Sequence, residues 1–137
     1  MKRIWILIVI GVVMLSSLAF TEGLVLVVNK GNSLNELPVA DAQAIFLGKK
    51  ANFPDGQVIL VVLMEGGGAH DALLSQIVKK NSSQFDAYWK KIIFTGTGAA
   101  PKYVKNEAEM INLVKSNVNA IGYLGSENAE VKTIAVQ

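Results

Sequence analysis

Two continuous apolar runs predict strands that are buried on both faces. The first covers residues 24–28 (LVLVV) and the second covers residues 58–63 (VILVVL). Both are short and rich in β-branched residues, which favours strands over helices. A short helix is expected between them, with Pro38 near its first turn and Gly48 in a left-handed cap at its end. Two such strands separated by a helix predict a parallel pair joined by a right-handed crossover.

The second half of the chain predicts three helices and two closing strands. Apolar residues at helical spacing indicate helices over about residues 69–80 and from Ser82 or Ser83 to Ile93. Another helix is expected after Asn106, which has the spacing of a capping box with Glu109. Apolar runs over residues 120–124 and 131–136 indicate strands. The pattern predicts one α/β domain, with a mostly parallel sheet flanked by helices.

The first 19 residues have the pattern of a secretory signal peptide. Lys2 and Arg3 precede the apolar residues 4–15, and Ser17 and Ala19 fit a cleavage site after Ala19. This apolar stretch is shorter than the roughly 20 residues of a membrane-spanning helix. We therefore expect a cleaved signal peptide over residues 1–19, export to the periplasm and a single mature domain over residues 20–137. An uncleaved membrane anchor is the alternative.

Charge and composition exclude several kinds of catalytic, metal-binding and nucleic-acid-binding site. The 137 residues include 13 basic and 11 acidic side chains, one histidine and no cysteine. Removal of residues 1–19 takes away Lys2 and Arg3 and no acidic residue, so the remainder is formally neutral. A neutral chain lacks the basic stripe that nucleic-acid binding requires. Thiolate catalysis, Cys-ligated zinc and multi-histidine sites are excluded. We expect no metal, no cofactor and no nucleic-acid partner.

One glycine run is the local feature with candidate chemistry. The segment that joins the second strand to a helix consists of Glu65, Gly66, Gly67, Gly68, Ala69 and His70. Backbone N–H groups can approach an anion at such a junction, because glycine has no β-carbon and the helix dipole favours negative charge. The run is neither a dinucleotide-binding nor a Walker A motif, so a plain turn is the alternative. Since His70 does not face its neighbour Asp71, we interpret His70 as a solvated or ligand-proximal residue.

Four aromatic residues lie in or next to the helix that is predicted to end near Ile93. Phe85, Tyr88, Trp89 and Phe94 lie at helical spacing, which is typical of core packing, although the same rings could stack against a ring-shaped ligand. If Tyr88 and Trp89 are buried, the O–H and the N–H each need a hydrogen-bond partner.

Five segments, taken in order, resemble the periplasmic phosphate-binding proteins of ABC transporters. They are LVVNK (26–30), AIFLGK (44–49), FPDG (53–56), YWKKIIFTG (88–96) and NAIGY (119–123). The resemblance covers nearly the whole mature chain and implies a type II periplasmic-binding-protein-like fold. The chain has the length of one lobe, whereas a second lobe closes over the ligand in that family. Where the phosphate binders hold the anion with an Arg and a Ser-Gly-Thr sequence, this chain has Leu63 and Gly67-Gly68-Ala69.

Three functions are compatible with these observations. The first is an exported, phosphate-transport-like binding protein that holds a small anion weakly at residues 65–70, with backbone N–H groups of Gly67, Gly68 and Ala69 as donors and His70 at the rim. A transporter protein, another envelope protein or a second copy of the chain would be its partner. The second is an interaction or assembly module that kept the fold and lost the anion. The third is an enzyme, which the sequence disfavours because it offers no triad, metal cluster or acid–base pair.

Overall fold

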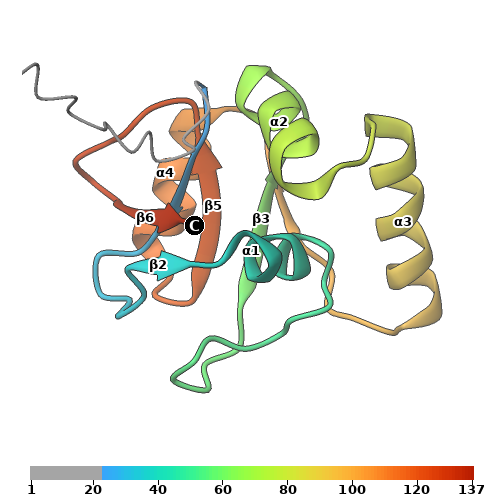
Figure 1. Ribbon diagram of the computed structural model, residues 1–137, viewed down its shortest axis with the longest axis horizontal. Coiled ribbons are helices and arrows are strands. Elements are labelled where there is room, and N and C mark those ends of the chain that lie inside the picture. The colour runs from blue at the N-terminus through green and yellow to red at the C-terminus, as the bar shows by residue number, and fades with distance from the viewer. Residues whose placement is uncertain (1–22) are drawn as a thin grey trace, which may run out of the picture.

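A computed structural model describes residues 23–137 (Figure 1), so the predicted signal peptide lies outside the described residues. The strands are β1 (Val25–Val28), β2 (Glu36–Leu37), β3 (Leu60–Met64), β4 (Lys102–Val104), β5 (Ala120–Leu124) and β6 (Lys132–Val136). The helices are α1 (Val39–Phe46), α2 (Gly68–Leu73), the π-helical segment η1 (Leu74–Val78), α3 (Ser82–Thr95) and α4 (Glu107–Ser116). No helix in residues 23–137 is long and apolar enough to cross a membrane.

The strands form one six-stranded sheet in the order β2-β6-β1-β5-β3-β4. The pairs β2–β6, β3–β5 and β3–β4 are parallel, whereas β1 is antiparallel to both β5 and β6. All described strands except β1 therefore point the same way. The predicted α/β fold with a mostly parallel sheet is confirmed.

The predicted parallel pairing of the first two long strands is wrong. β5 lies between β1 and β3 in the sheet, and β1 runs in the opposite direction to both. A continuous apolar run indicates burial on both faces, but it carries no information about which strand lies next to it. The neighbour of β1 comes from about 95 residues further along the chain, as in the pair of Val27 and Gly122.

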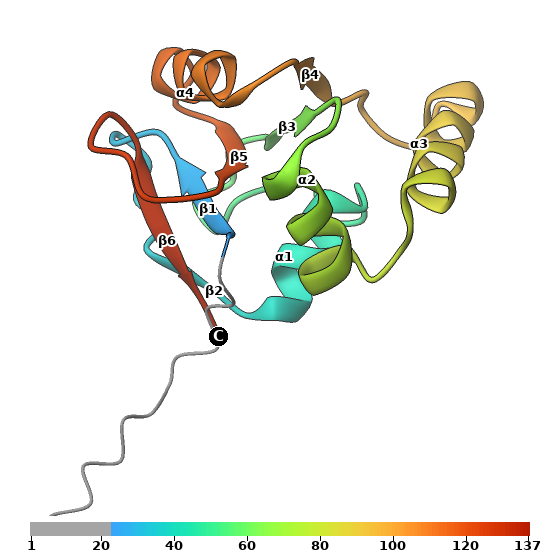
Figure 2. The ribbon, with the colours of Figure 1, turned by 90° about the horizontal axis from the view of Figure 1, so that it is seen from above.

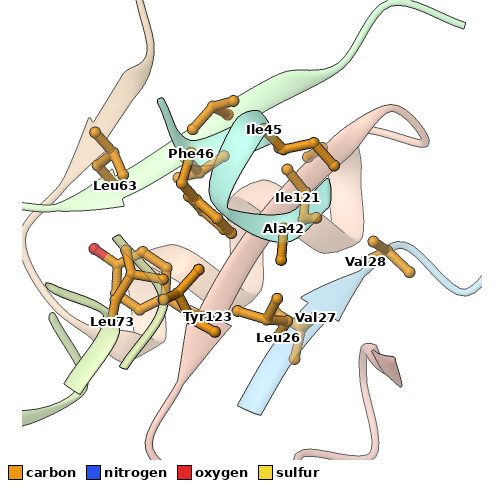
Figure 3. Close-up of a cluster of buried hydrophobic side chains, with 14 of the residues drawn as sticks. Leu26, Val27, Val28, Ala42, Ile45, Phe46, Leu63, Leu73, Ile121 and Tyr123 are labelled. Atoms are coloured by element: carbon orange, nitrogen blue, oxygen red, sulfur yellow. The ribbon is translucent and has the colours of Figure 1, made fainter. Parts of the chain in front are cut away.

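Helices cover both faces of the sheet (Figure 2). α4 packs on one face, against β5 and β3, and α1 and α2 lie on the other. α3 is set at one end of the molecule, beyond α2 and β4 (Figures 1 and 2). The core under α1 brings Ala42, Ile45 and Phe46 against side chains of β1 and β5 (Figure 3).

The ends of α1 follow the sequence prediction. Pro38 is the N-cap, with φ −58°, and Gly48 follows the C-terminus with φ +69°. Glycine adopts this left-handed conformation without the steric cost that a β-carbon imposes. The end of α1 is therefore fixed by local sequence.

The start of α3 differs from the prediction, and the start of α4 confirms it. α3 is capped by Asn81, not by Ser82 or Ser83, in a reciprocal capping box with Gln84. Asn106 caps α4, as expected, by accepting the Glu109 N–H. The Glu109 carboxylate accepts the N–H of Lys105 at 2.8 Å, which completes a variant of the predicted box displaced by one residue.

The predicted helix over residues 69–80 is divided. α2 continues as the π-helical segment η1, whose end is marked by the bond from the Lys79 N–H to the Leu74 carbonyl oxygen at 2.8 Å. The inward-facing residues of the prediction are all buried: Leu73, Leu74, Ile77 and Val78.

Candidate site at the glycine loop

The glycine loop, residues 65–69, lies on the surface between β3 and α2. Glu65, Gly66, Gly67 and Gly68 are exposed, whereas Ala69 is buried. The first helical bond of α2 runs from the Asp71 N–H to the Gly67 carbonyl oxygen at 3.0 Å, and the start of the helix has no side-chain cap. The first N–H groups of a helix have no acceptor within it. The start of α2 therefore has N–H groups without an acceptor within the helix, next to an exposed loop.

Gly67 has a backbone conformation that requires glycine. Its φ is +105°, in a region that residues with a β-carbon rarely adopt. A β-carbon placed on Gly66, Gly67 or Gly68 would have no atom within 4 Å. Space alone would thus accept a side chain in the loop, and only Gly67 is restricted by its backbone.

His70 is buried, so the first of its two interpretations, a solvated residue, is wrong. Its exposed fraction is 6%, and its Nδ1 lies 2.6 Å from the hydroxyl oxygen of Tyr123. The same oxygen accepts the backbone N–H of Met64 at 2.6 Å. Tyr123 is fully buried on β5, under α1 (Figure 3). The ring of His70 therefore lies beneath the loop, within a buried hydrogen-bond network.

The donors in the network depend on which ring nitrogen of His70 carries the proton. Tyr123 accepts the Met64 N–H, and its own O–H has an acceptor, Nδ1 of His70, in the tautomer that carries its proton on Nε2. Burial raises the pKa of Tyr123 above its usual range, so the hydroxyl stays protonated. Burial also lowers the pKa of His70 from 6.5, with Asp71 and Asp86 acting in the opposite direction. The neutral imidazole is the form that satisfies all three groups.

Three carboxylates belong to the loop or act on His70. Glu65 is exposed in the loop, and Asp71 and Asp86 both act electrostatically on His70. Leu63, on β3, is completely buried. Residues 65–69 carry no cationic side chain, so the donors that this segment itself offers are backbone N–H groups. Residues 23–137 contain no group of three or more His, Cys, Asp or Glu side chains placed to hold a metal.

The aromatic cluster divides between the core and the surface. Phe85 and Trp89 are buried, with their rings edge-to-face at 6.5 Å, which confirms core packing for these two residues. Tyr88 donates its O–H to the Leu47 carbonyl oxygen at 2.6 Å. Within the described residues, Nε1 of Trp89 is buried without a hydrogen-bond partner. Phe94 is 92% exposed and does not belong to the core.

An open depression of about 470 Å³ lies away from the glycine loop. Its lining includes Lys30, Lys132 and Glu127. Lys132 already donates to the carbonyl oxygen of Asn32 and to Asn35. The lining thus combines two lysines, one of them held by two acceptors, with one glutamate.

Several solved structures have a fold similar to that of this chain. An ABC-type phosphate transport receptor from Vibrio cholerae is similar with a TM-score of 0.66 and 23% identity, over 84% of this chain and 46% of the receptor. A putative phosphate ABC transporter substrate-binding protein with bound phosphate, from Clostridium perfringens, has a TM-score of 0.65 and 23% identity, over 84% and 45%. A possible phosphate binding protein from Planctomyces limnophilus has a TM-score of 0.61 and 16% identity, over 85% and 42%.

These similarities define the class of fold. No protein-family model matches the sequence, and no curated protein is significantly similar to it. The chain has the periplasmic-binding-protein-like α/β fold of these receptors and spans a little less than half of their length. The resemblance seen in the sequence is confirmed at the level of the fold.

Sequence reasoning missed Tyr123 as part of the site. The predicted strand over residues 120–124 is confirmed, but Tyr123 is not distinguished from its apolar neighbours in it. A tyrosine within a fully buried strand needs a partner for its O–H. That requirement indicates a buried polar contact, although it does not identify His70 as the partner.

Proposed function

We propose that this protein is an exported, single-lobe substrate-binding protein that holds a phosphate-like anion weakly at the glycine loop. The backbone N–H groups of Gly67, Gly68 and Ala69 are the donors. The observation that carries the proposal is the exposed, uncapped start of α2 directly after Gly67, in a fold shared with phosphate transport receptors. His70 lies below the donors and contacts Tyr123, so its role is indirect.

Weak binding follows from what surrounds the loop. Charge-assisted hydrogen bonds contribute about 1.5–3 kcal/mol each, so a site with Leu63 in place of an Arg is expected to bind about ten- to a hundredfold less tightly. The exposed carboxylate of Glu65 repels a fully ionised ligand. It can accept a hydrogen bond from an anion that keeps one proton, which favours monohydrogen or dihydrogen phosphate over sulfate.

A partner completes the site in this proposal. Ligand sites bury most of their ligand, whereas an exposed loop on one lobe covers one side of it. A transporter or other envelope protein, or a second copy of the chain, supplies the opposite wall. We propose residues 1–19 as the signal peptide, residues 20–137 as one periplasmic domain and a non-enzymatic role for the protein.

A ligand-free interaction module is the second candidate. The buried Leu63 and the missing hydroxyl side chains in residues 67–69 favour it, because both remove side-chain contacts to an anion. The exposed Phe94, with Ile93 at 47% exposure beside it, adds apolar surface on α3. This candidate predicts no response to any small anion and stable capture of an envelope protein.

Titration calorimetry with two matched glycine variants tests the proposal. Gly67 and Gly56 both have positive φ, +105° and +88°, and a β-carbon on either has no atom within 4 Å. Gly67→Ala and Gly56→Ala should therefore destabilise the fold to a similar extent. Only Gly67→Ala should weaken phosphate binding, because it changes the direction of the donors. Equal phosphate affinity in the two variants would remove the loop as the binding site.

A further inference from the structure

One hydroxyl group holds both ends of the glycine loop. Met64 is the last residue of β3, directly before the loop, and His70 directly follows it. The Tyr123 oxygen accepts the Met64 N–H at 2.6 Å and lies 2.6 Å from Nδ1 of His70. Tyr123 itself comes from β5, more than 50 residues further along the chain. We call these three groups the loop anchor.

Few contacts besides the anchor fix the loop. Its three glycines have no side chains, and the space around each of their β-carbon positions is empty. The bond from the Glu65 N–H to the Val104 carbonyl oxygen at 2.9 Å holds its first residue, and the bond from the Asp71 N–H to the Gly67 carbonyl oxygen at 3.0 Å, with the buried side chain of Ala69, holds its helical end. The position of the Gly66–Gly68 amides therefore depends on how firmly the two ends are held.

We propose that Tyr123 is a positioning residue for the glycine loop, and that the anchor holds the loop only while His70 is neutral. The effect on anion affinity rests on the proposed function, whereas the effect on the loop itself does not. The proposal makes the loop amides sensitive to pH through a residue that does not contact the ligand.

The effect of pH on the anchor follows from which atoms can donate and which can accept a hydrogen bond. A neutral His70 accepts the Tyr123 O–H at Nδ1. A protonated His70 is a donor at both ring nitrogens, so the Tyr123 proton loses its acceptor in a buried site. The groups that act on His70 are Asp71 on α2 and Asp86 on α3, through their charges, and Tyr123 on β5, through its hydroxyl; the ring of Phe85 lies at 6.2 Å between centroids. The two carboxylates favour the proton, and burial opposes it more strongly.

NMR of the ligand-free protein measures the conformation of the loop directly, through the amide resonances of Gly66, Gly67 and Gly68. In the unchanged protein they should shift together on acidification, following one titration. Tyr123→Phe should displace these resonances and speed their hydrogen exchange at neutral pH. Tyr88→Phe is the matched control, because it removes an O–H that donates at 2.6 Å to Leu47, outside the anchor. It should leave the three amides unchanged.

A second variant tests the same proposal if Tyr123→Phe does not fold. His70→Gln retains an acceptor for the Tyr123 O–H but does not titrate, so it should keep the loop resonances near their neutral-pH positions and abolish their pH dependence. Loop amides that do not respond to pH in the unchanged protein, or that respond equally in His70→Gln, would overturn the proposal.

Phosphate titrations separate this inference from the proposed function. If the unchanged protein binds phosphate, Tyr123→Phe should bind roughly tenfold less tightly, as expected for misplaced backbone donors. Unaltered affinity together with unaltered loop amides would overturn the anchor. If no form of the protein binds phosphate while the amides respond as described, the anchor stands and the proposed ligand is wrong.

Discussion

A β-carbon on Gly122 would lie 2.4 Å from Sδ of Met110, so helix α4 packs directly on the backbone of β5. The same position would bring Cγ2 of Val114 to 3.3 Å. Both partners belong to the buried face of α4. Glycine at this point of the central sheet therefore sets how closely the helix approaches, next to the tyrosine that anchors the glycine loop.

Gly122→Ala should destabilise the protein by about 1–3 kcal/mol, the usual effect of overpacking a well-packed core. Urea unfolding would show the loss as a lower midpoint. Gly66→Ala is the control, since a β-carbon there has no neighbour within 4 Å and its φ is not positive. It should change stability by about 0.5 kcal/mol or less. Equal midpoints for the two variants would contradict the close packing.

Gly48 and Trp89 should be energetically coupled. A β-carbon on Gly48 would lie 2.9 Å from Cη2 of Trp89, and its φ of +69° adds backbone strain of about 1–2 kcal/mol. Gly48→Ala should therefore be more costly in the unchanged protein than in a Trp89→Phe background, where the clashing ring atoms are gone. A double-mutant cycle from urea unfolding measures the difference, and additive effects would contradict the contact.

The stability of the protein should fall on acidification through His70. Burial lowers the pKa of His70 in the folded state below the 6.5 of the unfolded chain, so the unfolded state binds more protons as the pH falls past that value. The contribution of His70 is present above pH 6.5 and is lost as the pH approaches the folded-state pKa. Unfolding free energies of the unchanged protein and His70→Gln, measured between about pH 8 and about pH 5, should converge at the acidic end. Parallel curves would contradict the assignment.

Phe94 should contribute almost nothing to stability. Its side chain is 92% exposed, so Phe94→Ser should change the free energy of unfolding by about 0.5 kcal/mol or less. Phe85→Ser, at a position with 1% exposure nearer the start of the same helix, should prevent stable folding or reduce the unfolding free energy by several kcal/mol. Thermal unfolding of both variants checks the contrast, and a large loss in Phe94→Ser would contradict its exposure.

Local sequence signals predicted where helices end better than which strands pair with each other. Pro38, Gly48 and Asn106 mark helix ends that the structure confirms, because each acts through its own backbone or through a residue a few positions away. The direction of β1 is set by its pairing with β5 and β6, near the other end of the chain. No residue within β1 encodes that partner, so the apolar run predicted burial correctly and orientation wrongly.

The short strands were missed for a related reason. β2 has two residues and β4 has three, and both lie at the edges of the sheet. Their sequences, EL and KYV, are too short to show an alternating pattern. They become strands because β6 and β3 offer parallel partners.

The sequence predicted the glycine junction between β3 and α2 but not the buried contact beneath it. Three consecutive glycines after an apolar strand indicate an exposed junction, and the structure has one. The contact of His70 with Tyr123 joins residues 53 positions apart. A histidine in the first turn of a helix gives no sign that its ring points into the core, so its burial required the tertiary structure.

Thermal unfolding with and without phosphate, at matched ionic strength with sulfate and chloride as controls, tests the proposed anion site most directly. At about 100 times its dissociation constant, a single bound ligand stabilises the folded state by about 2.7 kcal/mol, or roughly 10 °C for a domain of this size. We predict a phosphate-selective rise in melting temperature that Gly67→Ala removes and Gly56→Ala retains. An unchanged melting temperature at every phosphate concentration, or an equal rise with sulfate, would contradict phosphate recognition by the glycine loop.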